Sequence, residues 1–131
     1  MLDAFTIDLP QYNIYNSSVS PLVEYSKTHK PSVYDENEIK RLIPYAKQTD
    51  FILSTFSDIV DDLNYDKEKF ENIIYSFDDD YDMLKEFASH LQPKLKIHNE
   101  LYILTQNILT NLVKVQNELG LIISQHEHNQ I

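Results

Sequence analysis

The chain has 131 residues, with 21 acidic and 11 basic side chains, one glycine, five prolines and no cysteine or tryptophan. A chain of this length favours one domain around a single core. The single glycine, Gly120, argues against hairpin-rich β folds, Rossmann turns and phosphate loops, because those backbones need positive φ at several positions. The absence of cysteine excludes disulfides, cysteine zinc sites and thiol catalysis, and it favours an intracellular compartment. A predominantly helical protein is what we expect.

We expect neither a secretory leader nor a membrane span from the sequence. Residues 1–5 lack the basic and apolar regions of a signal peptide, and no stretch approaches the ~18 apolar residues needed to cross a bilayer. We therefore expect a soluble, intracellular protein of the cytoplasm or nucleus.

Residues 1–34 are predicted to form an extended N-terminal arm. Three prolines interrupt this stretch, and its asparagines and serines are typical of turns. Ser20 followed by Pro21 could also begin a short helix that runs through Lys27. The arm is rich in aromatic side chains that lie outside the predicted core of the helices. They are available to bind a partner; the alternative is that they pack on the chain's own bundle. We expect a protein-binding role for Phe5, Tyr12 and Tyr15.

Residues 35–131 are predicted to form a three-helix bundle. Apolar residues recur at alternating spacings of three and four over 36–63, 67–91 and 93–125, which indicates three long helices. Helices of this length with seven-residue recurrence favour an elongated antiparallel bundle with coiled-coil-like packing.

The ends of these helices are predicted from capping residues and prolines. Ser32 or Asp35 is expected to cap the first long helix, and Asp66 is expected to cap the second. Pro44 should kink the first helix or split off its first turns, because proline lacks a backbone donor and crowds the preceding turn. Pro93 is expected to open the third helix.

The third predicted helix is apolar over more of its circumference than is typical of an amphipathic helix with one solvent-exposed face. Only six of the residues 93–131 are charged. This pattern predicts either a central core helix or an interface helix. Four aliphatic residues outside its main stripe are therefore expected to bind a protein partner: Leu109, Val113, Leu121 and Ile123.

The acidic residues are concentrated in one segment. Residues 58–82 contain ten acidic and two basic side chains, so they account for −8 of the net charge of −10. Such a segment repels phosphate, which disfavours direct binding to nucleic acid or to an anionic membrane. We expect it to attract a basic protein partner instead, through Asp61, Asp62, Asp78, Asp79, Asp80 and Asp82.

No spacing in the sequence predicts a catalytic or metal site. Asp78, Asp80 and Asp82 match the start of an EF-hand loop, but the glycine and the final glutamate of that loop are missing, so a solvated acidic helix face is expected. Glu86 and His90 stand four apart on one predicted helix face, which favours a surface contact over a metal site. We therefore expect a protein that is not an enzyme and that holds no cofactor or metal.

These features favour a non-catalytic interaction subunit or adaptor of a larger helical assembly. It would form homo- or hetero-oligomers through the third predicted helix and the arm. The alternative is a small acidic inhibitor, either a nucleic-acid mimic of the anti-defence type or an immunity-type protein, that blocks a basic site on a target enzyme. The same acidic surface would serve both kinds of inhibitor, so the sequence leaves them open.

Overall fold

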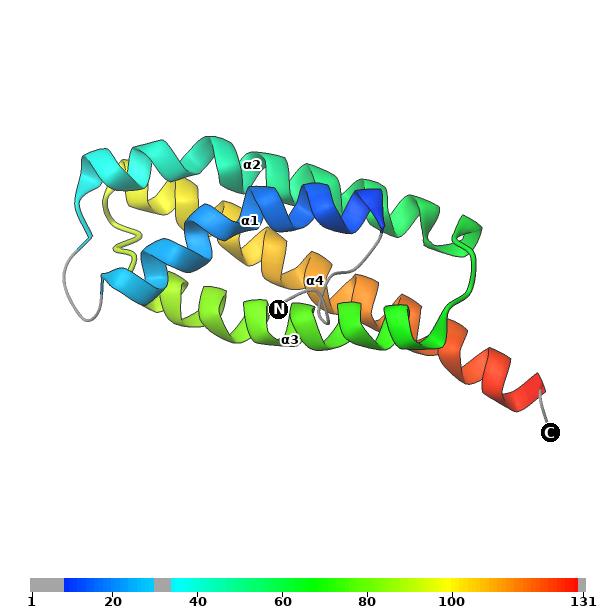
Figure 1. The fold of residues 1–131 in the computed structure, drawn as a ribbon. Helices are drawn as coiled ribbons and strands as arrows, with labels where there is room; N and C mark the ends of the chain where they lie inside the picture. Colours follow the sequence, from blue (N-terminus) through cyan, green and yellow to red (C-terminus); the bar gives the residue numbers. More distant parts are fainter. Residues whose placement is uncertain (1–8, 30–33, 130–131) are drawn as a thin grey trace.

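The described chain folds into four α-helices that pack side by side (Figure 1). The computed structural model describes residues 9–29 and 34–129. In chain order the elements are α1 (Pro10–Thr28), α2 (Glu36–Ile59), the short 3₁₀ turn η2 (Val60–Asp62), α3 (Lys67–Ser89) and α4 (Lys96–Asn129). Consecutive helices run in opposite directions in Figure 1. Since α1 and α4 each pack against both α2 and α3, they occupy diagonal corners of the bundle.

The expected number of helices is wrong, because the predicted extended arm contains α1. Pro10 stands at the start of this helix, where its missing N–H would have no partner in any case. Pro21 lies inside the helix, and an internal proline costs about 3 kcal/mol. Tyr12, Tyr15 and Leu22 are buried on one face of α1, and each large buried side chain contributes about 1.5–3 kcal/mol. Burial therefore outweighs the proline, and α1 is longer than the short helix expected between residues 20 and 27.

The predicted caps of α2 and α3 are confirmed. The Asp35 carboxylate accepts a hydrogen bond from the backbone N–H of Glu38 at 3.1 Å. The Asp66 carboxylate accepts one from the backbone N–H of Lys69, also at 3.1 Å. Each aspartate thus satisfies a donor that the first turn of its helix leaves without an intrahelical partner.

Pro44 and Pro93 do not set the helix boundaries that were expected of them. Pro44 lies within α2 at an exposed position, and the helix continues through it rather than losing its first turns. Pro93 falls in the turn after α3, and α4 begins at Lys96.

The core lies between the four helices and is centred on aromatic side chains. The ring centroid of Phe77 on α3 is 4.8 Å from that of Tyr15 on α1 and 6.1 Å from that of Phe56 on α2. All three side chains are fully buried. α4 completes the core with Leu101, Ile108, Leu112, Val115 and Leu119. These contacts make α1 an integral part of the bundle.

The C-terminal turns of α4 extend past the connection between α2 and α3 (Figure 1). The ring of His126 stacks on that of Tyr65, with centroids 3.7 Å apart. Lys67 Nζ donates to the Glu127 carboxylate at 2.6 Å, and this contact raises the pKa of the lysine. Both contacts hold the end of α4 against the residues that lead into α3.

Candidate functional site

One candidate surface is the side of α4 that points away from the other helices. This α4 outward face consists of exposed residues only: Ile103, Gln106, Asn107, Thr110, Val113, Lys114, Asn117 and Leu121. Its aliphatic members Ile103, Val113 and Leu121 are 52%, 40% and 59% exposed. Lys114 is the one charged residue between positions 101 and 117. A strongly acidic chain thus presents a helix surface that is almost uncharged and partly apolar.

Polar contacts along both flanks of α4 fix which residues face outward. Toward α2, the Asn111 amide donates to the Asp50 carboxylate at 2.7 Å, and the Ser57 hydroxyl donates to the Glu118 carboxylate at 2.8 Å. Toward α3, the Gln116 amide donates to a backbone carbonyl oxygen at 2.9 Å. Since both flanks are bonded, rotation of α4 about its axis would break several hydrogen bonds.

The structure separates the four aliphatic residues of α4 that were expected to bind a partner. Val113 and Leu121 lie on the α4 outward face, whereas Leu109 and Ile123 are buried in the core. α4 packs against both α2 and α3, so its buried arc is wider than the single stripe visible in the sequence. Ile103 belongs to the outward face and was not predicted.

The aromatic residues expected to bind a partner from the arm are placed differently. Tyr12 and Tyr15 are buried between α1 and its neighbours, and both rings contact Phe77 in the core of the bundle. The prediction that these two side chains lie outside the helical core is therefore wrong. Phe5 lies outside the described residues.

A second candidate surface is a groove of about 680 Å³ between α1 and α3. Tyr12 and Lys27 line it from α1, and Tyr75, Ser76 and three aspartates line it from α3. The hydroxyl groups of Tyr12 and Ser76 lie 2.5 Å apart across it. The groove therefore combines aromatic surface with three carboxylates and one ammonium group.

The Tyr15 hydroxyl donates to the Asp80 carboxylate at 2.6 Å and links α1 to α3. Burial raises the pKa of Asp80; the hydrogen bond from Tyr15 partly offsets this, and the charge of Asp79 reinforces it. Burial also raises the pKa of Tyr15 well above its ordinary value, and the charge of Asp80 adds to that effect. Tyr15 thus keeps its proton and acts as the donor of this pair.

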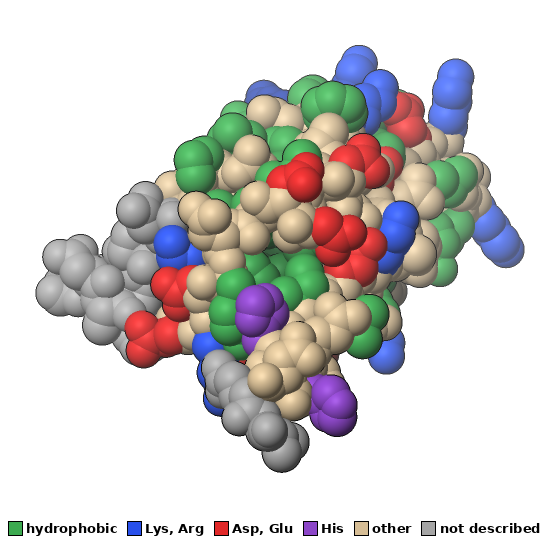
Figure 2. Space-filling view, turned by 90° about the vertical axis from the view of Figure 1, so that its right-hand side faces the viewer, with side chains coloured by type: hydrophobic (Ala, Val, Ile, Leu, Met, Phe, Trp, Pro, Cys, Tyr) green, Lys and Arg blue, Asp and Glu red, His purple; other side chains and the backbone are tan. Residues whose placement is uncertain are grey.

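The six aspartates of the predicted acidic surface do not all lie together. The carboxylates of the groove belong to Asp79, Asp80 and Asp82. Asp61 and Asp62 are exposed on η2, at the end of the bundle where α2 leads into α3. Figure 2 faces this end and shows acidic side chains gathered beside hydrophobic ones. Asp78 is exposed on α3 outside the groove.

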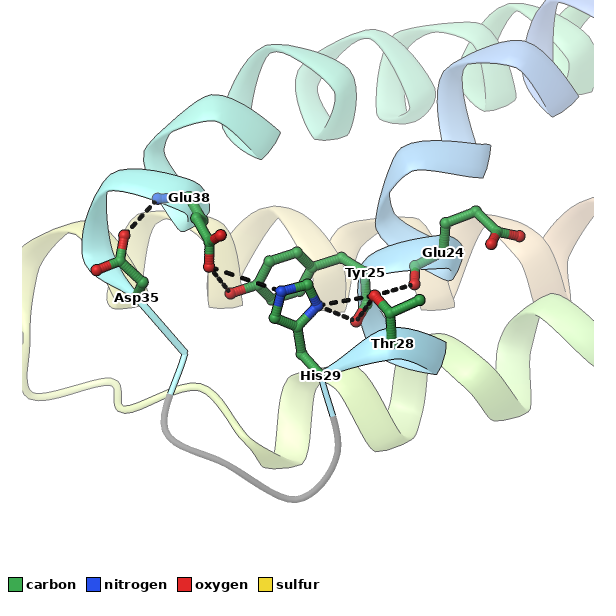
Figure 3. A network of polar contacts seen from close by, with 6 residues as sticks. All are labelled: Glu24, Tyr25, Thr28, His29, Asp35 and Glu38. Atoms are coloured by element: carbon green, nitrogen blue, oxygen red, sulfur yellow. Dashed lines mark hydrogen bonds and ion pairs between the residues drawn. The ribbon is translucent and has the colours of Figure 1, made fainter.

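A polar cluster joins the end of α1 to the start of α2 (Figure 3). The Tyr25 hydroxyl donates to the Glu38 carboxylate at 2.9 Å, and a ring nitrogen of His29 lies 3.7 Å from the same carboxylate. The rings of Tyr25 and His29 stack with centroids 3.7 Å apart. Burial, and then the contact with Glu38, raises the pKa of Tyr25. The cluster holds two helices together, and we assign it a structural role.

Within residues 9–29 and 34–129, no three histidine, aspartate or glutamate side chains gather closely enough to hold a metal ion. Glu86 and His90, which stand one turn apart, approach to 3.9 Å. In the same part of the chain, no helix combines the length and the apolar character needed to cross a membrane. Comparison of the chain with protein-family models, curated proteins and solved structures finds no match.

Proposed function

We propose that the protein is a non-catalytic interaction subunit that binds a protein partner through the α4 outward face. The observation that carries this proposal is the exposure of Ile103, Val113 and Leu121 on a surface with one charge. Covering exposed aliphatic groups is favourable by about 25 cal/mol per Å² of apolar area. The amides and hydroxyls around them can be covered without the large desolvation cost of ions.

The fixed position of α4 supports the same role. Interface centres are depleted in charged residues, and the α4 outward face shares that composition. The hydrogen bonds along both flanks of α4 hold this face in place before any partner arrives. Binding to a preorganised helix loses less conformational freedom than binding that must first order the chain.

Paired charge substitutions test the proposal. Ile103→Lys with Leu121→Lys places two ammonium groups on the α4 outward face. Phe51→Lys with Ile14→Lys is the matched control, because these side chains are 67% and 50% exposed on α2 and α1. The measurement is size-exclusion chromatography of each chain in extracts of the cells that naturally express it, prepared after chemical crosslinking of the living cells so that weak complexes survive dilution. We expect the wild type and the control in a larger assembly and the α4 variant outside it; co-elution of the α4 variant with the wild type would refute the proposal.

A second candidate function, the blocking of a basic site on a target enzyme, is supported by the groove between α1 and α3. Its aspartates stand beside the rings of Tyr12 and Tyr75. A lysine or arginine side chain of a partner would meet opposite charge and aromatic faces together. Such a contact would weaken as the ionic strength rises.

Neutral substitutions test this second function. Asp79→Asn with Asp82→Asn removes two groove charges, while Asp61→Asn with Asp62→Asn removes two charges from η2 and serves as the control. Loss of binding to a basic target and of its salt dependence is expected for the first pair alone. Equal effects of the two pairs would show that net charge acts and the groove does not.

A further inference from the structure

We infer that the partner of the α4 outward face is a second copy of this chain, with the two α4 helices antiparallel about a two-fold axis at the level of residue 112. This inference rests on the proposed function and names its partner. Six outward residues recur at spacings of four and three: Ile103, Asn107, Thr110, Lys114, Asn117 and Leu121. This alternation keeps one line of side chains on the same side of a helix, as in a coiled-coil seam.

The order of these six residues matches its own reverse in chemistry at the four outer positions, and the two central residues, Thr110 and Lys114, are compatible without being alike. An antiparallel two-fold axis places each residue opposite the one that lies equally far on the other side of residue 112. The resulting pairs are Ile103 with Leu121, Asn107 with Asn117, and Thr110 with Lys114. Aliphatic groups meet aliphatic groups, amides meet amides, and a hydroxyl meets an ammonium group. A contact between identical surfaces requires this kind of self-complementarity.

The charge distribution also favours this face for self-association. Each copy has a net charge of −10, so two copies repel where their acidic surfaces approach. The α4 outward face contains no carboxylate, and its Lys114 would face the neutral Thr110 of the other copy. The carboxylate of Glu118, on the flank of α4, already accepts a hydrogen bond from Ser57. Pairing through this face therefore places no carboxylate of one copy's face against a carboxylate of the other copy's face.

The expected dimer is weak and exchanges with monomer. Ile103 and Leu121 are 18 residues apart in the sequence. That separation corresponds to about 27 Å along a helix with ~1.5 Å rise per residue. A single helix face of this length buries less than the ~800 Å² per partner of a standard interface. We expect a dissociation constant on the order of micromolar or weaker.

The absence of native cysteine makes the antiparallel geometry measurable by crosslinking. Ile103→Cys and Leu121→Cys would be prepared as separate proteins and treated, alone and mixed, with a bismaleimide whose spacer is much shorter than the separation of the two sites. Antiparallel pairing predicts a crosslinked dimer in the mixture only, because identical positions would lie about 27 Å apart. Crosslinking of either variant alone contradicts the antiparallel arrangement. No crosslink in any sample, together with a monomer mass at every concentration in sedimentation equilibrium, overturns self-association.

Charge substitutions at Thr110 give an independent readout in the same dimer. Thr110→Glu should lower the dissociation constant of the dimer about two- to tenfold, because the new carboxylate would face Lys114 of the other copy at two symmetric places. Thr110→Lys should weaken it by a similar factor. Ser54→Glu, at an exposed position of α2, is the control for added charge. Changes of the same direction for both Thr110 variants would overturn the register.

Failure of self-pairing and failure of the proposed function give different results. In one outcome the purified wild type is monomeric, yet the variant with Ile103→Lys and Leu121→Lys is lost from the larger assembly in cell extracts. The face then binds a different protein, so the inference of a second copy is overturned while the proposed function stands. If that variant remains in the assembly and no dimer forms, the proposed function falls as well.

Discussion

Removing the Tyr15 hydroxyl tests whether α1 is energetically part of the bundle. The Tyr15 side chain is fully buried, and its hydroxyl donates at 2.6 Å to Asp80 on α3. Tyr15→Phe keeps the ring against Phe77 but leaves a half-buried carboxylate without this donor. A hydrogen bond to a charged group contributes about 1.5–3 kcal/mol, so we expect a loss of that size. Tyr15→Ala also removes the ring and should cost about 3–5 kcal/mol.

The assay is urea unfolding followed by circular dichroism at neutral pH. The midpoint should fall while the dependence of the unfolding free energy on urea stays the same, because the same surface is exposed. In thermal unfolding, the midpoint of a domain of this size should fall by about 3–5 °C per kcal/mol. Tyr75→Phe and Tyr75→Ala are the controls, because Tyr75 is 65% exposed, and both should stay within about 0.5 kcal/mol of the wild type. Tyr15→Ala unfolding at the wild-type midpoint would refute the role of α1 in the core.

Two further predictions concern ionisation and capping. Burial raises the pKa of Asp80 above its ordinary value of 3.8. In the pH window between the unfolded and the folded pKa, the folded protein keeps a proton on Asp80 that the unfolded chain has released. The unfolding free energy of the wild type therefore falls as the pH rises through this window. The unfolding free energy of Asp80→Asn should therefore rise relative to the wild type across that window, by at most about 1.4 kcal/mol per pH unit; a constant difference in urea titrations at a series of pH values contradicts this. Asp66→Ala removes the cap of α3 and should cost about 1 kcal/mol, whereas Asp62→Ala on η2 should cost less than half as much in the same assay. Equal losses for the two variants would show that the cap contributes nothing specific.

The helices after residue 35 follow closely from the sequence, because their apolar periodicity is strong and capping aspartates stand where α2 and α3 begin. α1 has the same kind of signal: Tyr12, Tyr15, Val19 and Leu22 recur at spacings of three and four. The extended arm was predicted because Pro10 and Pro21 were taken to outweigh this periodicity. Yet Pro10 is harmless at the first position of a helix, and burial of one helix face exceeds the cost of Pro21.

The candidate surfaces were only partly predictable, because they depend on which helices become neighbours. Val113 and Leu121 are exposed, as an interface residue must be, while Leu109 and Ile123 are covered because α4 touches two helices. The groove needs α1 as one wall, and the Tyr15–Asp80 hydrogen bond needs α1 beside α3. Neither could be found while α1 was predicted as an extended arm. Pairings between residues far apart in the chain leave no local periodic signal.

Cysteine footprinting measures most directly whether a protein covers the α4 outward face in the cell. Leu121→Cys and Phe51→Cys would each carry a single thiol at positions with 59% and 67% exposure in the native residue. Alkylation rates would be compared between the diluted purified protein and living cells that express the variant from its native locus. We predict that the cysteine at position 121 reacts several-fold more slowly in cells than in dilute solution, relative to the cysteine at position 51. Equal relative rates in the two settings would contradict a covered α4 face.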